Sequence, residues 1–135
     1  MANILGPMGS ALYTKLAAGT ALTTLLGGTA IYNGLVPQGT ATPYVVYQFT
    51  SGSDLNSSPR RARDYVVTIK AVSDEQAEAE NVDDALDTLM HEATLTITGW
   101  GNYWTARDQD VVYEQYAGGI VYWHRGARYR IRVAE

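Results

Sequence analysis

Between Ala127 and Val133 the sequence alternates without interruption between arginine and apolar side chains. Successive side chains of a β-strand point to opposite faces, so this pattern predicts a strand with one buried face and one solvated face. A sheet built from such strands needs a layer that covers its apolar side. The solvated positions are Arg128, Arg130 and Arg132, and the buried positions are Ala127, Tyr129, Ile131 and Val133.

Further β-prone segments surround this strand. Residues 44–51 and 65–72 alternate in the same way, and the segment between them, residues 52–64, is rich in Ser, Asn, Pro and Arg. This predicts an antiparallel hairpin with a long, polar and mobile tip. Residues 95–100, 111–116 and 120–133 also read as strands, with a turn at Gly118-Gly119, a bend or bulge at Gly126 and a looser stretch at 102–110.

The helical segments are shorter. Ser10 and Thr20 begin two short N-terminal helical stretches, and Ser73 with Gln76 forms a capping box for a helix that runs to about His91. In that last helix Ala79, Val82, Leu86, Leu89 and Ala93 form one apolar stripe, which we expect to face the core.

The predicted fold class is therefore α+β. We expect one mainly antiparallel sheet, a long acidic helix packed on one face, a short N-terminal helical region and a long β-hairpin extension. The chain has 135 residues, which fits one domain spanning residues 1–135.

Charge is segregated along the chain. Of 14 acidic residues, eight lie between Asp74 and Glu92 where there is no Lys or Arg, so the remaining six acids and ten bases carry a net charge of +4. Either this is a solvated helix face, or it is a surface that meets a basic surface on another subunit. The acidic candidates are Glu78, Glu80, Asp83, Asp84 and Asp87; the basic candidates are Arg60, Arg61 and Arg63 in the hairpin tip, or Arg128, Arg130 and Arg132 on the last strand.

Three aromatic residues are also candidate interface residues. Trp100, Tyr103 and Trp104 lie close together in a segment predicted to be irregular, where partly exposed amphipathic rings suit a protein interface. Stacking on nucleic-acid bases is the competing use, but Arg107 is the only basic residue nearby and the net charge of −4 argues against nucleic-acid binding.

Catalytic, cofactor and metal sites are not predicted. The chain has no Cys, its two histidines lie in different predicted elements, and neither glycine pair is followed by a phosphate-binding Lys. No G-x-S-x-G motif occurs, and the carboxylates share one solvated helix face instead of the distinct environments that an acid–base pair needs. No apolar run is long enough to span a bilayer, and residues 1–9 lack the charge pattern of a signal peptide. A small enzyme or ligand-binding domain stays the least favoured class.

Several stretches resemble the tail-completion, or tail-terminator, proteins of long-tailed phages and gene transfer agents. They are ALYTKL at 11–16, LLGGTAIYNGLVPQGTATPYVVY at 25–47, LTITGW at 95–100 and HRGARYRIRV at 124–133. The most specific part is VPQGTATPYVVY at residues 36–47.

This resemblance implies a structural virion protein with no catalytic residues and no cofactor. Such proteins are expected to form a homo-oligomeric ring, a hexamer, at the head-proximal end of the tail, after synthesis in the host cytoplasm. The expected partners are other copies of the chain, the tail tube protein and the head–tail connector or stopper protein, with DNA passing through the ring without sequence-specific binding. The alternative is a head-side connector or stopper protein of the same neck.

Overall fold

The computed structural model describes residues 4–56 and 58–135; of the segments discussed above, residues 1–3 of the N-terminus and Ser57 of the hairpin tip lie outside the described residues. Within them the chain forms six strands and three helices. The strands are β1 (Ile31–Asn33), β2 (Tyr44–Asp54), β3 (Ala62–Ser73), β4 (Thr96–Ile97), β5 (Trp100–Ala117) and β6 (Ile120–Ala134). The helices are α1 (Leu5–Ala17), α2 (Thr20–Leu26) and α3 (Gln76–Met90).

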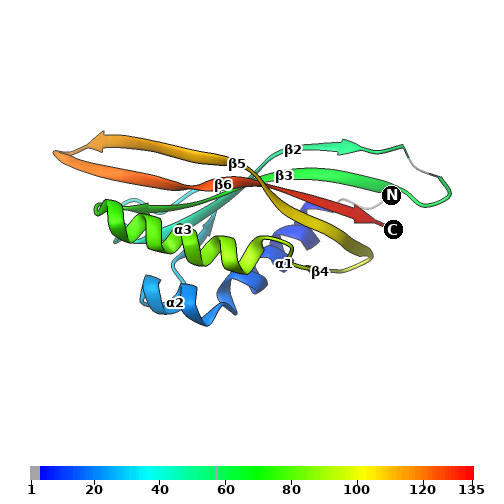
Figure 1. The fold of residues 1–135 in the computed structure, drawn as a ribbon, viewed down its shortest axis with the longest axis horizontal. Coiled ribbons are helices and arrows are strands. Elements are labelled where there is room, and N and C mark those ends of the chain that lie inside the picture. Colours follow the sequence, from blue (N-terminus) through cyan, green and yellow to red (C-terminus); the bar gives the residue numbers. More distant parts are fainter. Residues whose placement is uncertain (1–3, 57) are drawn as a thin grey trace.

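The strands form a single twisted sheet in the order β1-β2-β3-β6-β5-β4. β1 runs parallel to β2, and the remaining neighbours are antiparallel. Figure 1 shows the described helices together on one face of this sheet, with α3 beneath β3 and β6 and with α2 beneath α3. We call the opposite side of the sheet, which none of these helices covers, the bare face.

The core lies between the sheet and the helices. Ala127, Tyr129, Ile131 and Val133 of β6 have no exposed surface, whereas the arginines between them are exposed or half-buried. The alternation at residues 127–133 is thus satisfied by one covered face. From below, α3 contributes a stripe of Ala79, Val82, Leu86 and Met90, with Leu89 half-buried at its margin. Each of the larger side chains contributes about 1.5–3 kcal/mol by leaving water.

The predicted fold class is wrong. The sheet is a mixed six-stranded sheet because β1 pairs parallel with β2, and the covering layer is built by three helices instead of one long acidic helix. α1 and α2 supply much of the apolar material of the core, through Ile4 just before α1 and through Met8, Leu12, Leu16, Leu22 and Leu26. The sequence analysis began α1 at Ser10 because Gly6, Pro7 and Gly9 are unfavourable in a helix interior. Pro7 is tolerated because it lies in the first turn.

Several predicted boundaries also change. Both ends of the segment 52–64 belong to strands, because β2 runs to Asp54 and β3 begins at Ala62, so the tip is confined to residues 55–61. Residues 102–110, predicted to be loose, belong to β5. Residues 95–100, predicted to be one strand, contain the two-residue β4, a turn and Trp100, the first residue of β5. Ser73 does not cap α3 as predicted: the helix begins at Gln76, and the Ser73 hydroxyl accepts a hydrogen bond from the Glu75 amide instead. Residues 102–110 are held in a strand by their pairing with β6, a contact between distant segments that the local sequence pattern does not report.

Gly126 marks a close approach between strands and not the predicted bulge. β6 keeps its register with Lys70 of β3 and Val111 of β5 at this position. A Cβ atom at Gly126 would collide with the Ile69 carbonyl oxygen and with Lys70 Cα, both of which are backbone atoms. The strand therefore requires glycine here because no side chain fits between the two backbones.

We predict that Gly126→Ala lowers the free energy of unfolding by about 2 kcal/mol or more, because a backbone collision cannot be relieved by a side-chain rotation. Urea unfolding measures this. Gly101→Ala is the matched control, since its Cβ would lie 3.7 Å from the nearest atom, an ordinary contact. Equal stability of the two variants would show that β3 and β6 have room to separate at Gly126.

Candidate functional site

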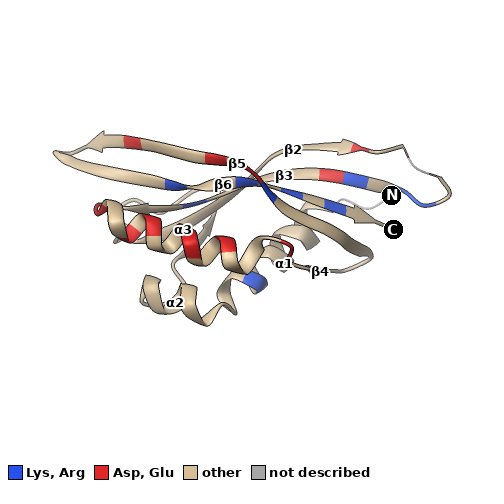
Figure 2. Ribbon diagram, viewed as in Figure 1, with Lys and Arg blue, Asp and Glu red and all other residues tan. Residues whose placement is uncertain are grey.

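The molecule has two projecting ends. In Figure 1 the β5–β6 hairpin extends past the helices at one end, and the β2–β3 hairpin extends at the opposite end. Figure 2 shows that acidic residues gather on α3 and on β5 toward the first end, whereas the arginines of the β2–β3 tip and the last part of β6 lie toward the second. Basic residues also lie on β6 toward the first end, and acidic residues on β2 and β3 toward the second, so the charge segregation of the sequence becomes a partial polarity along the long axis.

Most of the predicted acidic residues already have partners within the chain. Glu78 accepts a hydrogen bond from the Ser73 hydroxyl, and Glu80 pairs with Arg125 at 3.5 Å. Asp83 and Asp87 both pair with Arg107. Asp84 is exposed, and its carboxylate has no ion-pair partner among the described residues. Asp84 is therefore the member of this set that is available to another molecule.

Arg107 is the centre of the largest polar cluster and was not predicted as a site residue. Its guanidinium pairs with Asp83 at 3.2 Å, with Asp87 at 3.4 Å and with Asp110 at 2.9 Å, and it donates to the Gly126 carbonyl oxygen. Burial alone would lower the pKa of Arg107, but its hydrogen bonds to Asp83 and Asp110 outweigh this effect and raise the pKa. The cluster ties α3 to β5 and β6. Two features of the sequence point to this cluster. Arg107 stands beside Asp108 and Asp110, and Asp83 and Asp87 are one helical turn apart, so they share one side of the helix.

The arginines of β6 are also engaged within the chain. Arg130 and Arg132 flank Asp64, at 2.7 Å and 3.7 Å from its carboxylate, and Asp64 is only 4% exposed. The Arg132 guanidinium lies 4.5 Å from the centre of the Trp104 ring, and Arg128 donates to Gln109. These contacts run across β3, β6 and β5 on the bare face, so they stabilise that face and leave it basic.

The hairpin tip contains one arginine without a partner. Arg61 pairs with Asp54 at 2.7 Å, and Arg63 lies over the Tyr65 ring. The Asn56 amide and then Arg61 hold the pKa of Asp54 below its ordinary value. Arg60 is exposed and makes no ion pair with the described residues.

The predicted aromatic residues separate in the structure. Trp100 is buried within the core, while Tyr103 is 57% exposed and Trp104 is 40% exposed. A second apolar surface, which sequence reasoning missed, lies on the β5–β6 hairpin: Val112 is 62% exposed and Tyr116 is 75% exposed, with Ile120 and Val121 beside them. The sequence did contain an indication of this surface: residues 111–123 carry apolar side chains on both faces of a predicted hairpin, and one covering layer can bury only one of those faces.

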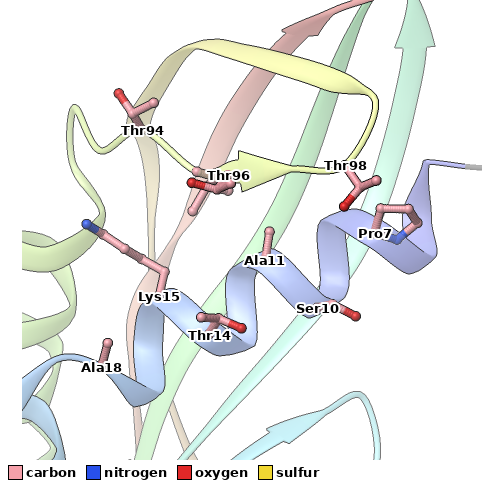
Figure 3. A pocket seen from close by; sticks show the side chains of 10 residues that line it. Pro7, Ser10, Ala11, Thr14, Lys15, Ala18, Thr94, Thr96 and Thr98 are labelled. Atoms are coloured by element: carbon pink, nitrogen blue, oxygen red, sulfur yellow. The ribbon is translucent and has the colours of Figure 1, made fainter.

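The concave surface beside α1 does not resemble an active site. It has a volume of about 790 Å³ and lies between α1 and the β4 region (Figure 3). It is lined by threonines on one side, Thr94, Thr96 and Thr98, and by Lys15 and small residues of α1 on the other. The lining contains neither histidine nor carboxylate, and the described residues hold no cluster of His, Asp or Glu able to bind a metal. No described helix is both long and apolar enough to cross a membrane.

His124 is buried at the base of the β5–β6 hairpin. Its ring stacks on Tyr113 with centroids 4.3 Å apart, and Nε2 lies 3.1 Å from the Gln115 side-chain oxygen. Burial, followed by the charges of Lys70 and Arg125, lowers the pKa of His124 to about 4. The ring is therefore neutral at physiological pH and acts in packing.

Comparison with known proteins identifies the family. Residues 10–133 match the family described as tail completion protein gp17. The chain belongs to the tail completion protein family. It is accordingly a structural protein of a phage-type tail, associated with the virion and with other tail proteins.

Solved structures share the tail completion fold of this chain. A chain from the virion of a native gene transfer agent particle has 19% identity and a TM-score of 0.81, and the match covers 100% of both chains. A second solved chain has 13% identity and a TM-score of 0.60, with 96% of this chain and 94% of that chain covered. No curated protein matches the sequence.

We predict that Arg107→Met destabilises the tail completion fold by about 2–3 kcal/mol, because it leaves Asp83 and Asp87 without their counter-charge beside buried Tyr129. Urea unfolding at neutral pH measures the loss. Arg60→Met removes an unpaired, exposed charge and should change stability by no more than about 0.5 kcal/mol. Equal effects of the two substitutions would contradict a structural role for the Arg107 cluster.

We also predict an acid-sensitive stability that depends on His124. Its pKa is about 4 in the folded chain and 6.5 when exposed. Below pH 6.5 His124 therefore binds a proton in the unfolded chain but stays neutral in the folded chain. The free energy of unfolding falls with pH until about pH 4, where His124 of the folded chain is also protonated. The loss from this group is about 3 kcal/mol, at 1.36 kcal/mol for each pKa unit. His124→Phe keeps the ring on Tyr113 and should flatten the difference in unfolding free energy between pH 7 and 4.5; an unchanged slope would contradict the prediction.

Proposed function

We propose that this chain forms a closed ring of identical subunits, a hexamer, at the head-proximal end of the tail. The ring caps the tail tube, ends its elongation and provides the surface to which the head connector binds. Membership of the tail completion family carries this proposal. The full-length agreement of the fold with a chain of a gene transfer agent virion supports it.

The two sides of the sheet suit a terminator. Tube subunits stack because each layer presents the same surface to the next, so a protein that ends growth must bind that surface and present a different one. The bare face is basic, through Arg128, Arg130 and Arg132, whereas the other side is a helical layer with exposed Tyr13 and Leu25. Two such different surfaces allow one side to contact the tube and the other to contact the connector without an active site.

Contacts around the ring are proposed to follow the long-axis polarity. A cyclic ring requires a heterologous interface, in which two different patches of each subunit meet. Acidic residues on α3 and β5, with Asp84 unpaired, lie toward one end, and the β2–β3 tip with unpaired Arg60 forms the other. Charge complementarity of this kind sets the orientation and the rate of subunit association.

Loss of the gene tests the proposed function. We predict that a deletion leaves heads filled with DNA but unjoined, together with tails of abnormal and uncontrolled length, because nothing stops the stacking of tube subunits. Electron microscopy of the lysate measures tail length and joining, and the wild-type chain supplied in trans is the control. Tails of normal length that fail to join would indicate a head-side connector instead. Normal infectious particles would refute both functions.

A further inference from the structure

Two long strands of the sheet have outer edges that are only partly covered. β5 pairs with β6 over most of its length, but on its other side β4 pairs only with Trp100 and Gly101. The residues that follow α3 cover the next part of this side of β5. The Thr105 carbonyl accepts a hydrogen bond from the Glu92 amide, and the Arg107 amide donates one to His91 Nδ1. From residue 108 to 117 this edge has no backbone partner among the described residues. We call it the β5 edge.

The second uncovered edge belongs to β2. β1 covers β2 only at Val45, Val46 and Tyr47, and the Gly34 amide bonds the Tyr47 carbonyl at the end of that pairing. Residues 48–53 have no further backbone partner on this side in the described chain. We call this the β2 edge. The two edges lie on opposite sides of the sheet and toward opposite ends, one along the β5–β6 hairpin and the other along the β2–β3 hairpin (Figure 1).

The β5 edge has few of the features that keep an edge strand solvated. Exposed edges are usually short, or carry Lys, Pro or bulges. Both register shifts of β5 precede the last part of the strand, at Asn102/Trp104 and Arg107/Gln109. The final seven residues, 111–117, read VVYEQYA, with one charged residue and no proline. Val112 and Tyr116 are the most exposed of its large hydrophobic side chains, so this segment combines open backbone groups with apolar surface that a further strand would cover.

We propose that the β5 edge of one copy of this chain pairs with the β2 edge of the next copy, so that one sheet continues from subunit to subunit. The inference rests on the proposed ring and names the contact that closes it. β2 and β5 run in opposite directions, because three antiparallel pairings separate them in the order β2-β3-β6-β5. Neighbouring copies that keep similar orientations therefore bring the two edges together as an antiparallel pair, the sense with the more stable hydrogen-bond ladder.

Charge favours this occupant over a symmetric pair of β5 edges. The β5 edge carries Asp108, Asp110 and Glu114. Asp110 pairs with Arg107 and Glu114 with Arg125 of the same chain, but Asp108 has no ion-pair partner among the described residues, so two such edges would place acidic residues opposite each other. Residues 48–53 of the β2 edge read QFTSGS and carry no charge, and the nearby tip adds unpaired Arg60. The pairing is heterologous and directional, which is the type of contact that generates a cyclic ring.

Disulfide trapping with the full chain tests the pairing without background, because the protein contains no cysteine. Val112→Cys and Ala117→Cys place a thiol on either face of the β5 edge, and Ser51→Cys and Ser53→Cys place one on the β2 edge. All four positions are exposed. A disulfide requires Cα atoms within about 4.4–6.8 Å, so only paired strands bring these positions into reach. Ala21→Cys in α2 is the exposed control, away from both edges.

We expect a cross-linked two-chain product when a β5-edge variant is mixed with a β2-edge variant and oxidised under conditions where sedimentation shows assembly. Its yield should exceed that of mixtures with the Ala21→Cys control by about tenfold or more, because paired strands hold the thiols at a high effective concentration. Cross-linking of β5-edge variants alone, cross-linking of β2-edge variants alone, or a yield equal to the control would each overturn the pairing.

The same variants separate this inference from the proposed function. Each is supplied in trans to the deletion strain. Capped tails of normal length without the mixed cross-link would leave the terminator function standing and refute the edge pairing. A mixed cross-link, together with normal tails in the deletion strain itself, would keep the pairing and refute the function.

Discussion

Burial of the apolar side of β6 is the constraint on which the rest of the fold depends. β6 is a central strand, paired with β3 from Trp123 to Ala134 and with β5 from Ile120 to Ala134. Its residues Ala127, Tyr129, Ile131 and Val133 lose all contact with solvent. That face needs a cover, which α3 provides with Val82, Leu86 and Met90. Gly126 permits the close approach of β6 and β3. Arg107 of β5 then holds α3 against the sheet through its ion pairs with Asp83 and Asp87.

The same arrangement decides which charges are available for assembly. Asp83 and Asp87 pair with Arg107, and Asp64 pairs with both Arg130 and Arg132, so these ion pairs chiefly hold elements of one chain together. Removing one partner of such a partly buried pair destabilises the fold, so an effect of that change on assembly would not identify an interface. Asp84 and Arg60 differ because neither has an ion-pair partner in the described structure. The charged residues therefore divide into those that form ion pairs within the chain and those, such as Asp84 and Arg60, that are available to another subunit.

Local pattern predicted those elements whose burial is one-sided. The alternation of β6, the apolar stripe of α3 and the turn at Gly118-Gly119 are all present in the structure. It failed where distant partners decide the structure: it did not report that β1 pairs parallel with β2, or that polar residues 102–110 are held in β5 by β6. The Arg107 cluster joins residues about 20 positions apart, which explains why charge counting found the acids but not their partner.

The uncovered edges and the polarity of the charges follow from one topological fact. The two strands at the rims of the sheet, β1 and β4, have three and two residues, so each covers only a small part of the long strand beside it. Because β1 lies against the beginning of β2 and β4 against the beginning of β5, and because β2 and β5 run in opposite directions, the uncovered parts lie at opposite ends. A subunit with this arrangement has a donor end and an acceptor end for sheet extension. Repetition of that contact generates a ring when the rotation closes and a filament when it does not, so the curvature of the sheet decides between them.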